Sequence, residues 1–522
     1  ERWIVAPPKR PRFRCSATLR LILALRPANV GSGLIGGSIM TKRLISGLAL
    51  LAAIVGQTTA AASAPLVMSE TEAQAPALPP ILNARERAAT ENRILAERLD
   101  TIIPAIMREQ GVDLWLMVAR EYFEEPVVAS MLDAENMHAR RRTILIFHDP
   151  GNGEPIERLT VSRYGLGGLF APAWDPSKQP DQWQAVADLI AARDPAKIAI
   201  NTSDLYQFAD GMTLSQYEKF TGALPASLRS RIVSGEALAI RWLETRTPAE
   251  MEIYPSVLRT AHAIIAEAFS RAVITPGVTT AEQVQWWYRD RLLQLGLEPW
   301  FHPSVAIQRA GAKGMLEGDE VIQPGDLLWT DFGINYLRLS TDTQHLAYVL
   351  KPGERDAPAG LRQGLANSNR VQDILRRQFA VGRSGNAALA LARAEAVAAG
   401  LDPSIYTHPI GLHGHGAGPS IGFWDNQNAD PRGSGLIAAN TAWSIELTTF
   451  AAVPEWDGQR VDFEYDGEMG ADVALNSHRM EQYPFCRLSG TANVLVMPAI
   501  HSAAISTKML QELGGLTVMG PL

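Results

Sequence analysis

Asp331 and Asp342 are two acids in otherwise apolar sequence whose spacing could create a cation site. β-forming residues flank both acids, and residues 333–338 can supply a turn, so the segment is typical of a β-hairpin. A hairpin folded about residues 336–337 would place Asp331 directly opposite Asp342, with both side chains on one face. Two ionised carboxylates held this close repel each other and lose hydration. A cation between them would relieve both costs, although a polar hairpin tip also accounts for the pair taken alone.

Three histidines follow within residues 407–418, namely His408, His413 and His415. Glycines on both sides of His415 allow the backbone to approach whatever the imidazole binds. Only Gly414 separates His413 from His415, so both imidazoles would share a face if the segment is extended. His413 therefore stays an alternative to His415 as a metal ligand, and satisfying a turn is one of the roles weighed for His408.

Two later apolar segments carry further acids. Glu446 is the one acid of residues 441–447, which are predicted to form a strand. In residues 460–466 strict alternation puts the apolar side chains on one face and the acids on the other. The acids of that face are Asp462, Glu464 and Asp466. Glu464 is its only glutamate, but either aspartate could take the same role.

The ordered set of Asp, Asp, His, Glu and Glu, with the Gly-His-Gly core at residues 414–416, resembles the creatinase/aminopeptidase P/prolidase metallopeptidase family. The resemblance covers residues 85–480 and implies an N-terminal creatinase-like α/β domain followed by an α+β catalytic domain of the pita-bread fold. It also implies two divalent metal ions, manganese first, with cobalt or zinc as alternatives. The implied metal ligands are Asp331, Asp342, His415, Glu446 and Glu464, with Asp342 and Glu464 bridging the ions.

The function implied by this resemblance is a dinuclear metal-dependent exopeptidase similar to Xaa-Pro aminopeptidase or dipeptidase. It would hydrolyse the N-terminal peptide bond of a small peptide substrate through a metal-bridging hydroxide, with Glu446 moving the proton. Gln344 and His345 follow Asp342 closely and are expected to orient its carboxylate. Two alternatives remain open, a hydrolase of a non-peptide C–N bond and a non-catalytic binding protein that keeps the fold.

The chain departs from the family at two histidine positions. Peptidase members usually place one histidine about seventeen residues before the first metal Asp and another about seven residues after the metal His. Here these positions fall at residues 313–314 and at Gly422. Three nearby histidines are candidate replacements, namely His302, His408 and His413. We expect His413 to act as an oxyanion donor or as a hydrogen-bond partner of a metal ligand. The alternative role of His302 is ordinary packing, and that of His408 is to satisfy a turn.

Composition and the N-terminal sequence indicate an exported enzyme. The chain has 522 residues, enough for two domains, and its net charge of −7 gives no basic footprint for nucleic acid. Residues 40–64 combine a basic start, a short apolar stretch and small residues for cleavage, which predicts a secretory signal, with an uncleaved anchor as the alternative. Residues 1–39 are interpreted as an over-extended start. The mature protein is expected to be periplasmic or secreted, without stable membrane insertion.

Cysteine usage predicts no internal disulfide. The chain contains only Cys15 and Cys486, and Cys15 precedes the predicted signal. The folded protein must therefore be stabilised by its cores.

Two domains are predicted along the mature chain. Residues 65–245 alternate strands, at 112–118, 143–147 and 197–201, with helices such as 182–193, which is typical of an α/β layer. The resembling branch uses such a domain to shape the cleft and to dimerise, so a homodimer is also expected. Residues 246–522 form the predicted catalytic domain.

The catalytic domain is predicted to begin with a capped helix. Thr247 and Glu250 form a capping box, and Pro248 suits the first helical position. The helix is predicted to continue to about residue 273, with a kink near Pro255.

Overall fold

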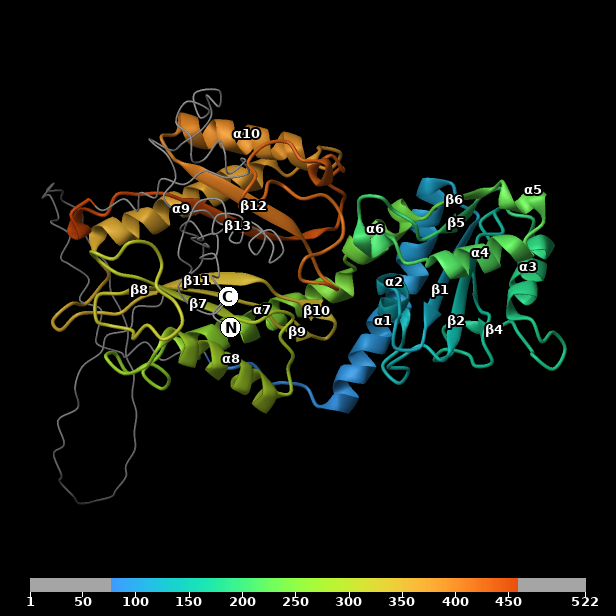
Figure 1. Ribbon diagram of the computed structural model, residues 1–522, viewed down its shortest axis with the longest axis horizontal. Coiled ribbons are helices and arrows are strands. Elements are labelled where there is room, and N and C mark those ends of the chain that lie inside the picture. The colour runs from blue at the N-terminus through green and yellow to red at the C-terminus, as the bar shows by residue number, and fades with distance from the viewer. Residues whose placement is uncertain (1–76, 459–522) are drawn as a thin grey trace, which may run out of the picture.

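The computed structural model describes residues 77–458 of the chain. The predicted secretory signal, both cysteines and the acidic face with Glu464 therefore lie outside the described residues. Figure 1 shows two lobes, and the chain passes from the first to the second near the end of α6. Among the described helices, none is both long enough and apolar enough to cross a membrane.

The first lobe is a six-stranded mixed sheet between two layers of helices (Figure 1), with the strand order β4-β3-β2-β1-β5-β6. Its strands are β1 (Leu114–Arg120), β2 (Arg142–His148), β3 (Glu157–Thr160), β4 (Ala171–Pro172), β5 (Ile198–Ile200) and β6 (Ile232–Ser234). Its helices are α1 (Ala84–Gln110), α2 (Pro126–Met131), α3 (Gln182–Arg193), η1 (Gln207–Ala209), α4 (Leu214–Ala223), α5 (Ala226–Arg229) and α6 (Glu236–Glu244).

Alternation along the central strand β1 explains the two helix layers. Trp115 and Met117 pack into the core shared with α1, α2 and α6, whereas Leu116 and Val118 pack into the core shared with α3, α4 and α5. A strand that is buried on both faces reads as a continuous apolar run. The predicted α/β layer is therefore confirmed for this lobe.

Besides the short antiparallel pair β10-β9, the second lobe contains two small antiparallel sheets, each covered by a pair of helices (Figure 1). The sheet β11-β8-β7 packs with α7 and α8, and the pair β12-β13 packs with α9 and α10. The strands are β7 (Ser304–Gln308), β8 (Leu327–Phe332), β9 (Asn335–Tyr336), β10 (Leu339–Ser340), β11 (Thr343–Tyr348), β12 (Pro403–Ile410) and β13 (Ala442–Thr449). The helices are α7 (Pro248–Ala268), α8 (Ala281–Leu295), α9 (Ala359–Gln378), α10 (Gly385–Ala398), η2 (Pro431–Gly433) and η3 (Pro454–Trp456).

The capping box at the start of α7 is confirmed. Thr247 Oγ1 accepts from the Glu250 amide at 3.3 Å, and Glu250 accepts from the Thr247 amide at 2.7 Å. Pro255 lies inside the helix as predicted. The helix ends at Ala268 rather than near residue 273, because Phe269 leaves helical geometry.

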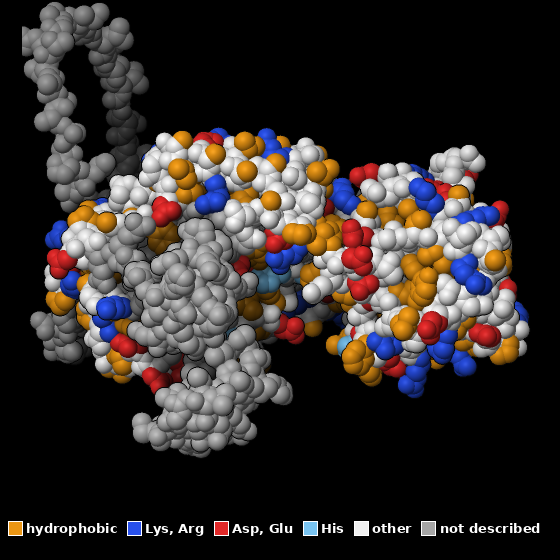
Figure 2. Space-filling view, turned by 45° about the horizontal axis from the view of Figure 1, so that its top comes forward, with side chains coloured by type: hydrophobic (Ala, Val, Ile, Leu, Met, Phe, Trp, Pro, Cys, Tyr) orange, Lys and Arg blue, Asp and Glu red, His pale blue; other side chains and the backbone are white. Residues whose placement is uncertain are grey.

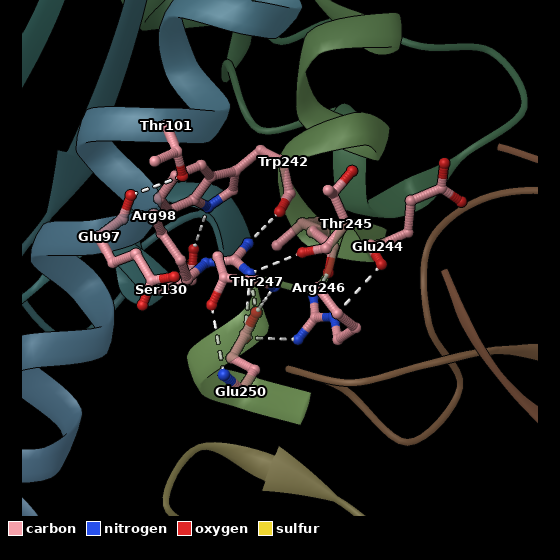
Figure 3. A network of polar contacts seen from close by, with 11 residues as sticks. Glu97, Arg98, Thr101, Ser130, Trp242, Glu244, Thr245, Arg246, Thr247 and Glu250 are labelled. Atoms are coloured by element: carbon pink, nitrogen blue, oxygen red, sulfur yellow. Dashed lines mark hydrogen bonds and ion pairs between the residues drawn. The ribbon is translucent and has the colours of Figure 1, made fainter. Parts of the chain in front are cut away.

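A buried ionic network joins the two lobes at this point (Figure 3). Glu250 of α7 accepts from Arg98 of α1 and from Arg246 of the connecting segment, in each case at 2.8 Å. Arg98 also donates to the carbonyl of Thr245 at 2.7 Å. These charged side chains are at most 2% exposed. One carboxylate is therefore shared by two guanidinium groups where the lobes meet.

Candidate metal centre

The two aspartates lie on a hairpin, as predicted, but the register is shifted by two residues. Asp331 of β8 pairs with Gln344 of β11, so the prediction that it directly faces Asp342 is wrong. The cause is the turn, which consists of Leu337 and Arg338 with φ of 54° and 58°. Two residues of the left-handed region make a tight turn that fits the strand twist, but its usual Asn-Gly signal is absent here. A shift by two keeps the same side-chain face, so both acids remain on one side of the sheet.

A buried imidazole, His408 of β12, lies between two buried carboxylates. Its Nε2 is 2.8 Å from Oε1 of Glu446 and 3.4 Å from Oδ2 of Asp342. Its Nδ1 donates to the carbonyl oxygen of Pro409 at 2.9 Å. The three side chains are 3–6% exposed. Pairing of β12 with β13 aligns Tyr406 with Glu446, which brings His408 beside this acid.

The electrostatics of this group fit a cation site. Burial alone would lower the pKa of His408, but its hydrogen bonds and charge contacts with Asp342 and Glu446 outweigh burial and raise the pKa to about 10. Burial and the nearby charge of Glu446 raise the pKa of Asp342. Buried acids that repel each other require positive charge, which a proton on His408 or a metal ion could supply.

Gln344 connects the remaining aspartate to this group. Its Nε2 donates to Oδ2 of Asp331 at 3.1 Å and to Oε2 of Glu446 at 2.8 Å. The Gln344 side chain is buried, so one amide holds carboxylates from two different sheets together. Gln344 was expected to orient Asp342, whereas these hydrogen bonds orient Asp331 and Glu446.

His415 also belongs to the cluster, but at its exposed edge. Asp342, His408 and His415 each offer a ligand atom, and these atoms lie within 4.8 Å of one another. The rings of His415 and His408 are 4.9 Å apart and perpendicular. Partial desolvation, followed by the neighbouring charge of His408, lowers the pKa of His415. His415 is exposed whereas His408 is buried, so His408 occupies the deeper ligand position.

His408 is the residue that the sequence interpretation missed. It was weighed as a replacement for a missing histidine or as a turn residue, and not as a metal ligand, yet it contacts two of the predicted metal ligands. One signal could have revealed it. If His408 is taken as the metal ligand, His415 falls at the seventh position after it, where the resembling peptidases carry their next histidine. The apparent loss of that histidine then disappears.

His413 lies away from the carboxylates. Its ring stacks on Phe208 of η1, in the first lobe, with 4.5 Å between centroids and 24° between planes. Burial, followed by the charge of Arg246, lowers its pKa to about 4, so the imidazole is neutral at physiological pH. The expected common face with His415 is therefore wrong, because the segment bends instead of forming a strand. This stacking gives no support to the role of oxyanion donor.

His302 is also displaced from the cluster. It is exposed, its ring lies 5.2 Å from that of Trp286 on α8, and its Nδ1 lies 3.5 Å from Arg289. Of the two roles weighed for His302, packing against α8 is the one that the structure shows. The catalytic role of His302 stays a prediction.

A cavity of about 290 Å³ opens beside the acids. Its described lining includes His262, Asp342, Gln344, His345, Arg376 and Glu446. This volume lies near the lower end of small-molecule sites, which span about 300–1,000 Å³. Figure 2 shows histidine side chains reaching the surface near the hollow between the lobes, with charged side chains close by. The candidate metal ligands therefore lie beside a cavity of the size of a small molecule.

The comparison with protein-family models identifies the catalytic lobe. Residues 256–470 match the model of metallopeptidase family M24. This segment belongs to that family. The matched segment includes Asp331, Asp342, His408, Glu446 and Glu464. The prediction of an α/β domain followed by an α+β pita-bread domain is confirmed. Divalent metal ions and peptide substrates are general properties of such enzymes.

Several solved structures are similar to the chain. The X-Pro aminopeptidase from Thermotoga maritima is 16% identical, with a TM-score of 0.45 over 66% of this chain and 94% of that chain. The Xaa-Pro dipeptidase from Bacillus anthracis is 18% identical, with a TM-score of 0.41 over 71% and 97%. The prolidase from Pyrococcus furiosus is 15% identical, with a TM-score of 0.40 over 66% and 98%.

The C-terminal sequence matches a different family. Residues 447–522 match the model of phosphate acetyl/butaryl transferase. A stretch of 71 residues is 82% identical to the NADP-dependent malic enzyme of Rhizobium meliloti, and a stretch of 66 residues is 54% identical to a probable NADP-dependent malic enzyme of Rickettsia prowazekii. The chain spans only 9% of the length of either relative. Glu464 lies in residues 447–470, which match both family models.

Proposed function

We propose that the chain is a metal-dependent exopeptidase that removes the N-terminal residue of a small peptide, with a preference for Xaa-Pro substrates. The observation that carries the proposal is the meeting of His408 with Asp342 and Glu446, in a buried group inside the M24 segment. Carboxylates with one imidazole suit manganese, cobalt or zinc. Bound ions would supply an activated water and polarise the scissile carbonyl.

The described residues have separate tasks in this proposal. Asp331, Asp342, His408 and Glu446 hold the metal, and Gln344 fixes the carboxylates of Asp331 and Glu446 through its amide. His415 is exposed beside the ligands, so its imidazole can contact a substrate without a change in the loop. Glu446 remains the proposed proton carrier. Glu464 remains the proposed fifth ligand, and it lies outside the described residues.

The test is metal removal and restoration. The purified chain is treated with a chelator, titrated with Mn²⁺, Co²⁺ or Zn²⁺, and assayed with Xaa-Pro dipeptides, Xaa-Pro tripeptides and matched Xaa-Ala peptides. Loss of turnover on chelation and its return with one of these ions is the expected result. Metal binding without cleavage of any peptide would overturn the peptidase proposal and favour another C–N bond or a binding role.

We also propose export across the inner membrane after recognition of residues 40–64, and assembly as a homodimer. The apolar stretch and the small residues of this segment support export. Sequencing of the mature N-terminus from a periplasmic fraction tests removal of the signal. Light scattering of the purified protein tests the dimer.

A further inference from the structure

Trp300 contacts the chain segment that carries Asp342 and the segment that carries His415. It precedes β7, and its Nε1 donates to the carbonyl oxygen of Thr341 at 2.8 Å. Thr341 is the residue immediately before Asp342. The indole ring also lies 5.0 Å from the ring of His415, at 75°. One half-buried side chain thus touches the neighbour of the proposed ligand Asp342 and, directly, the imidazole of His415 at the edge of the metal cluster.

Two glycines make room for this indole. A Cβ at Gly414, the residue immediately before His415, would lie 2.2 Å from a Trp300 ring carbon. A Cβ at Gly333, near the end of β8, would lie 2.3 Å from Trp300 Nε1 and 2.4 Å from the Thr341 carbonyl oxygen. Real Cβ atoms do not approach other atoms this closely, so any side chain at either position would displace the indole or the backbone.

The indole itself has little freedom to move. Phe301 packs against it with 4.4 Å between ring centroids and 65° between planes. Thr341 is fixed from its other side as well, because its amide donates to the carbonyl oxygen of Ile334 at 2.9 Å. The Trp300 ring is therefore a rigid spacer between two segments of the metal site.

We propose that Trp300 is a positioning residue that sets the separation of Asp342 from His415. Its indole N–H fixes the backbone before Asp342, and its ring edge fixes the loop at Gly414 from which His415 projects. This inference rests on the proposed metal-dependent function. It assigns Trp300 no contact with the reacting atoms. Its effect on metal binding and turnover passes entirely through the two side chains that it holds apart.

Two substitutions separate the contributions of the hydrogen bond and the ring. Trp300→Phe removes the N–H and keeps an aromatic ring, whereas Trp300→Leu removes both. We expect Mn²⁺ affinity to fall by about tenfold or less in Trp300→Phe, the effect of one lost hydrogen bond, and further in Trp300→Leu. kcat for a cleaved peptide should fall more steeply, by up to about a hundredfold in Trp300→Leu, because catalysis is more sensitive to misplacement. The matched control is Trp286→Phe, an exposed tryptophan on α8 that should change neither quantity.

A double-mutant cycle tests the fit of the ring against Gly414. Gly414→Ala should lower Mn²⁺ affinity strongly when Trp300 is present, but only slightly when residue 300 is leucine, because the clashing ring is then gone. Strict additivity of the two substitutions would overturn the proposal. The proposal would also be overturned if Trp300→Phe and Trp300→Leu kept the wild-type Mn²⁺ affinity and kcat, whatever their melting temperatures. If Trp300→Leu does not fold, Trp300→Phe alone decides by the same criterion.

Failure of this inference is distinguishable from failure of the proposed function. A wild-type chain that binds no Mn²⁺ and cleaves no peptide removes the function itself. A wild-type chain that binds Mn²⁺, with Trp300 variants that bind it equally well, removes only the positioning role.

Discussion

At the scale of single residues, three histidines of one short segment have three different environments. His408 has the buried position between Asp342 and Glu446, His415 lies at the edge, and His413 stacks on the other lobe. Residue types and their order along the chain selected Asp331, Asp342 and Glu446, which His408 and Gln344 connect in the structure. They could not rank three histidines in one short segment, because that ranking depends on how β12 pairs with β13.

Replacement of His408 should strongly weaken metal binding. His408→Ala removes an imidazole within 3.4 Å of two carboxylates, so we expect Mn²⁺ affinity to fall by at least about a hundredfold. His413→Ala is the matched control and should retain metal, because its ring stacks on Phe208. Isothermal titration of both variants checks this. Equal metal loss in the two variants would contradict the assignment.

Metal binding should release a proton, and the metal affinity should increase with pH. Without metal, His408 has a raised pKa of about 10, so it is protonated at neutral pH. A ligand must be neutral to bind metal, so each unit of pH increase below 10 should raise apparent affinity by up to about tenfold. Titrations in buffers of different ionisation enthalpy measure the released proton. A Mn²⁺ affinity that does not change between pH 6 and 8 would exclude His408 as the displaced acid.

At the scale of elements, sequence patterns predicted the helix boundaries that depend on local interactions. Helix α3 occupies residues 182–193 as predicted, and α7 starts at its predicted capping box, because caps and periodic apolar residues act within one turn. The hairpin register was missed because Leu337 and Arg338 adopt left-handed geometry without a glycine or asparagine signal. Arg338 is held by Glu91 of α1, a contact between lobes that no local pattern encodes.

Helix α2 provides a pH-sensitive element. Glu125 caps its N-terminus through the amides of Val127 and Val128, and burial raises the pKa of this carboxyl from 4.5 to about 7. The folded state therefore holds the proton more tightly than the unfolded state. The resulting stabilisation is complete below pH 4.5 and is lost as pH rises through 7, by at most about 3 kcal/mol.

Glu125→Gln should flatten this dependence. The amide cannot ionise, so denaturation curves of the variant should change less between pH 5 and pH 8.5 than those of the wild type. At pH 5 the variant should be less stable by about 1 kcal/mol, because the amide caps less well. The control is Asp181→Asn, at the exposed N-cap of α3, which should keep the wild-type slope. An unchanged slope in Glu125→Gln would show that another group causes it.

At the scale of the whole chain, two families meet within residues 447–470. If Glu464 acts as the proposed fifth ligand, the chain should bind two metal ions, and Glu464→Gln should lower the stoichiometry or the affinity of one. If the C-terminal stretch serves a different role, Glu464→Gln should bind metal as the wild type does. Elemental analysis with quantified protein decides between the two outcomes, and Asp342→Ala supplies the metal-free reference.

The junction between the lobes should be costly to disrupt. Glu250→Gln leaves Arg98 and Arg246 buried without a carboxylate, and breaking a buried pair in this way destabilises by about 3–5 kcal/mol. A lower midpoint in urea denaturation measures this effect. Glu252→Gln, exposed on the same helix, is the control and should leave the midpoint unchanged. A midpoint for Glu250→Gln equal to that of the control would show that the network adds nothing to stability.

The shared carboxylate of Glu250 also affects the cooperativity of unfolding. Separation of the lobes would break the buried ion pair between Arg98 of one lobe and Glu250 of the other. Melting should therefore be cooperative across both lobes, as a single endotherm with matching calorimetric and van't Hoff enthalpies. Expression of either half alone should yield an aggregation-prone polypeptide.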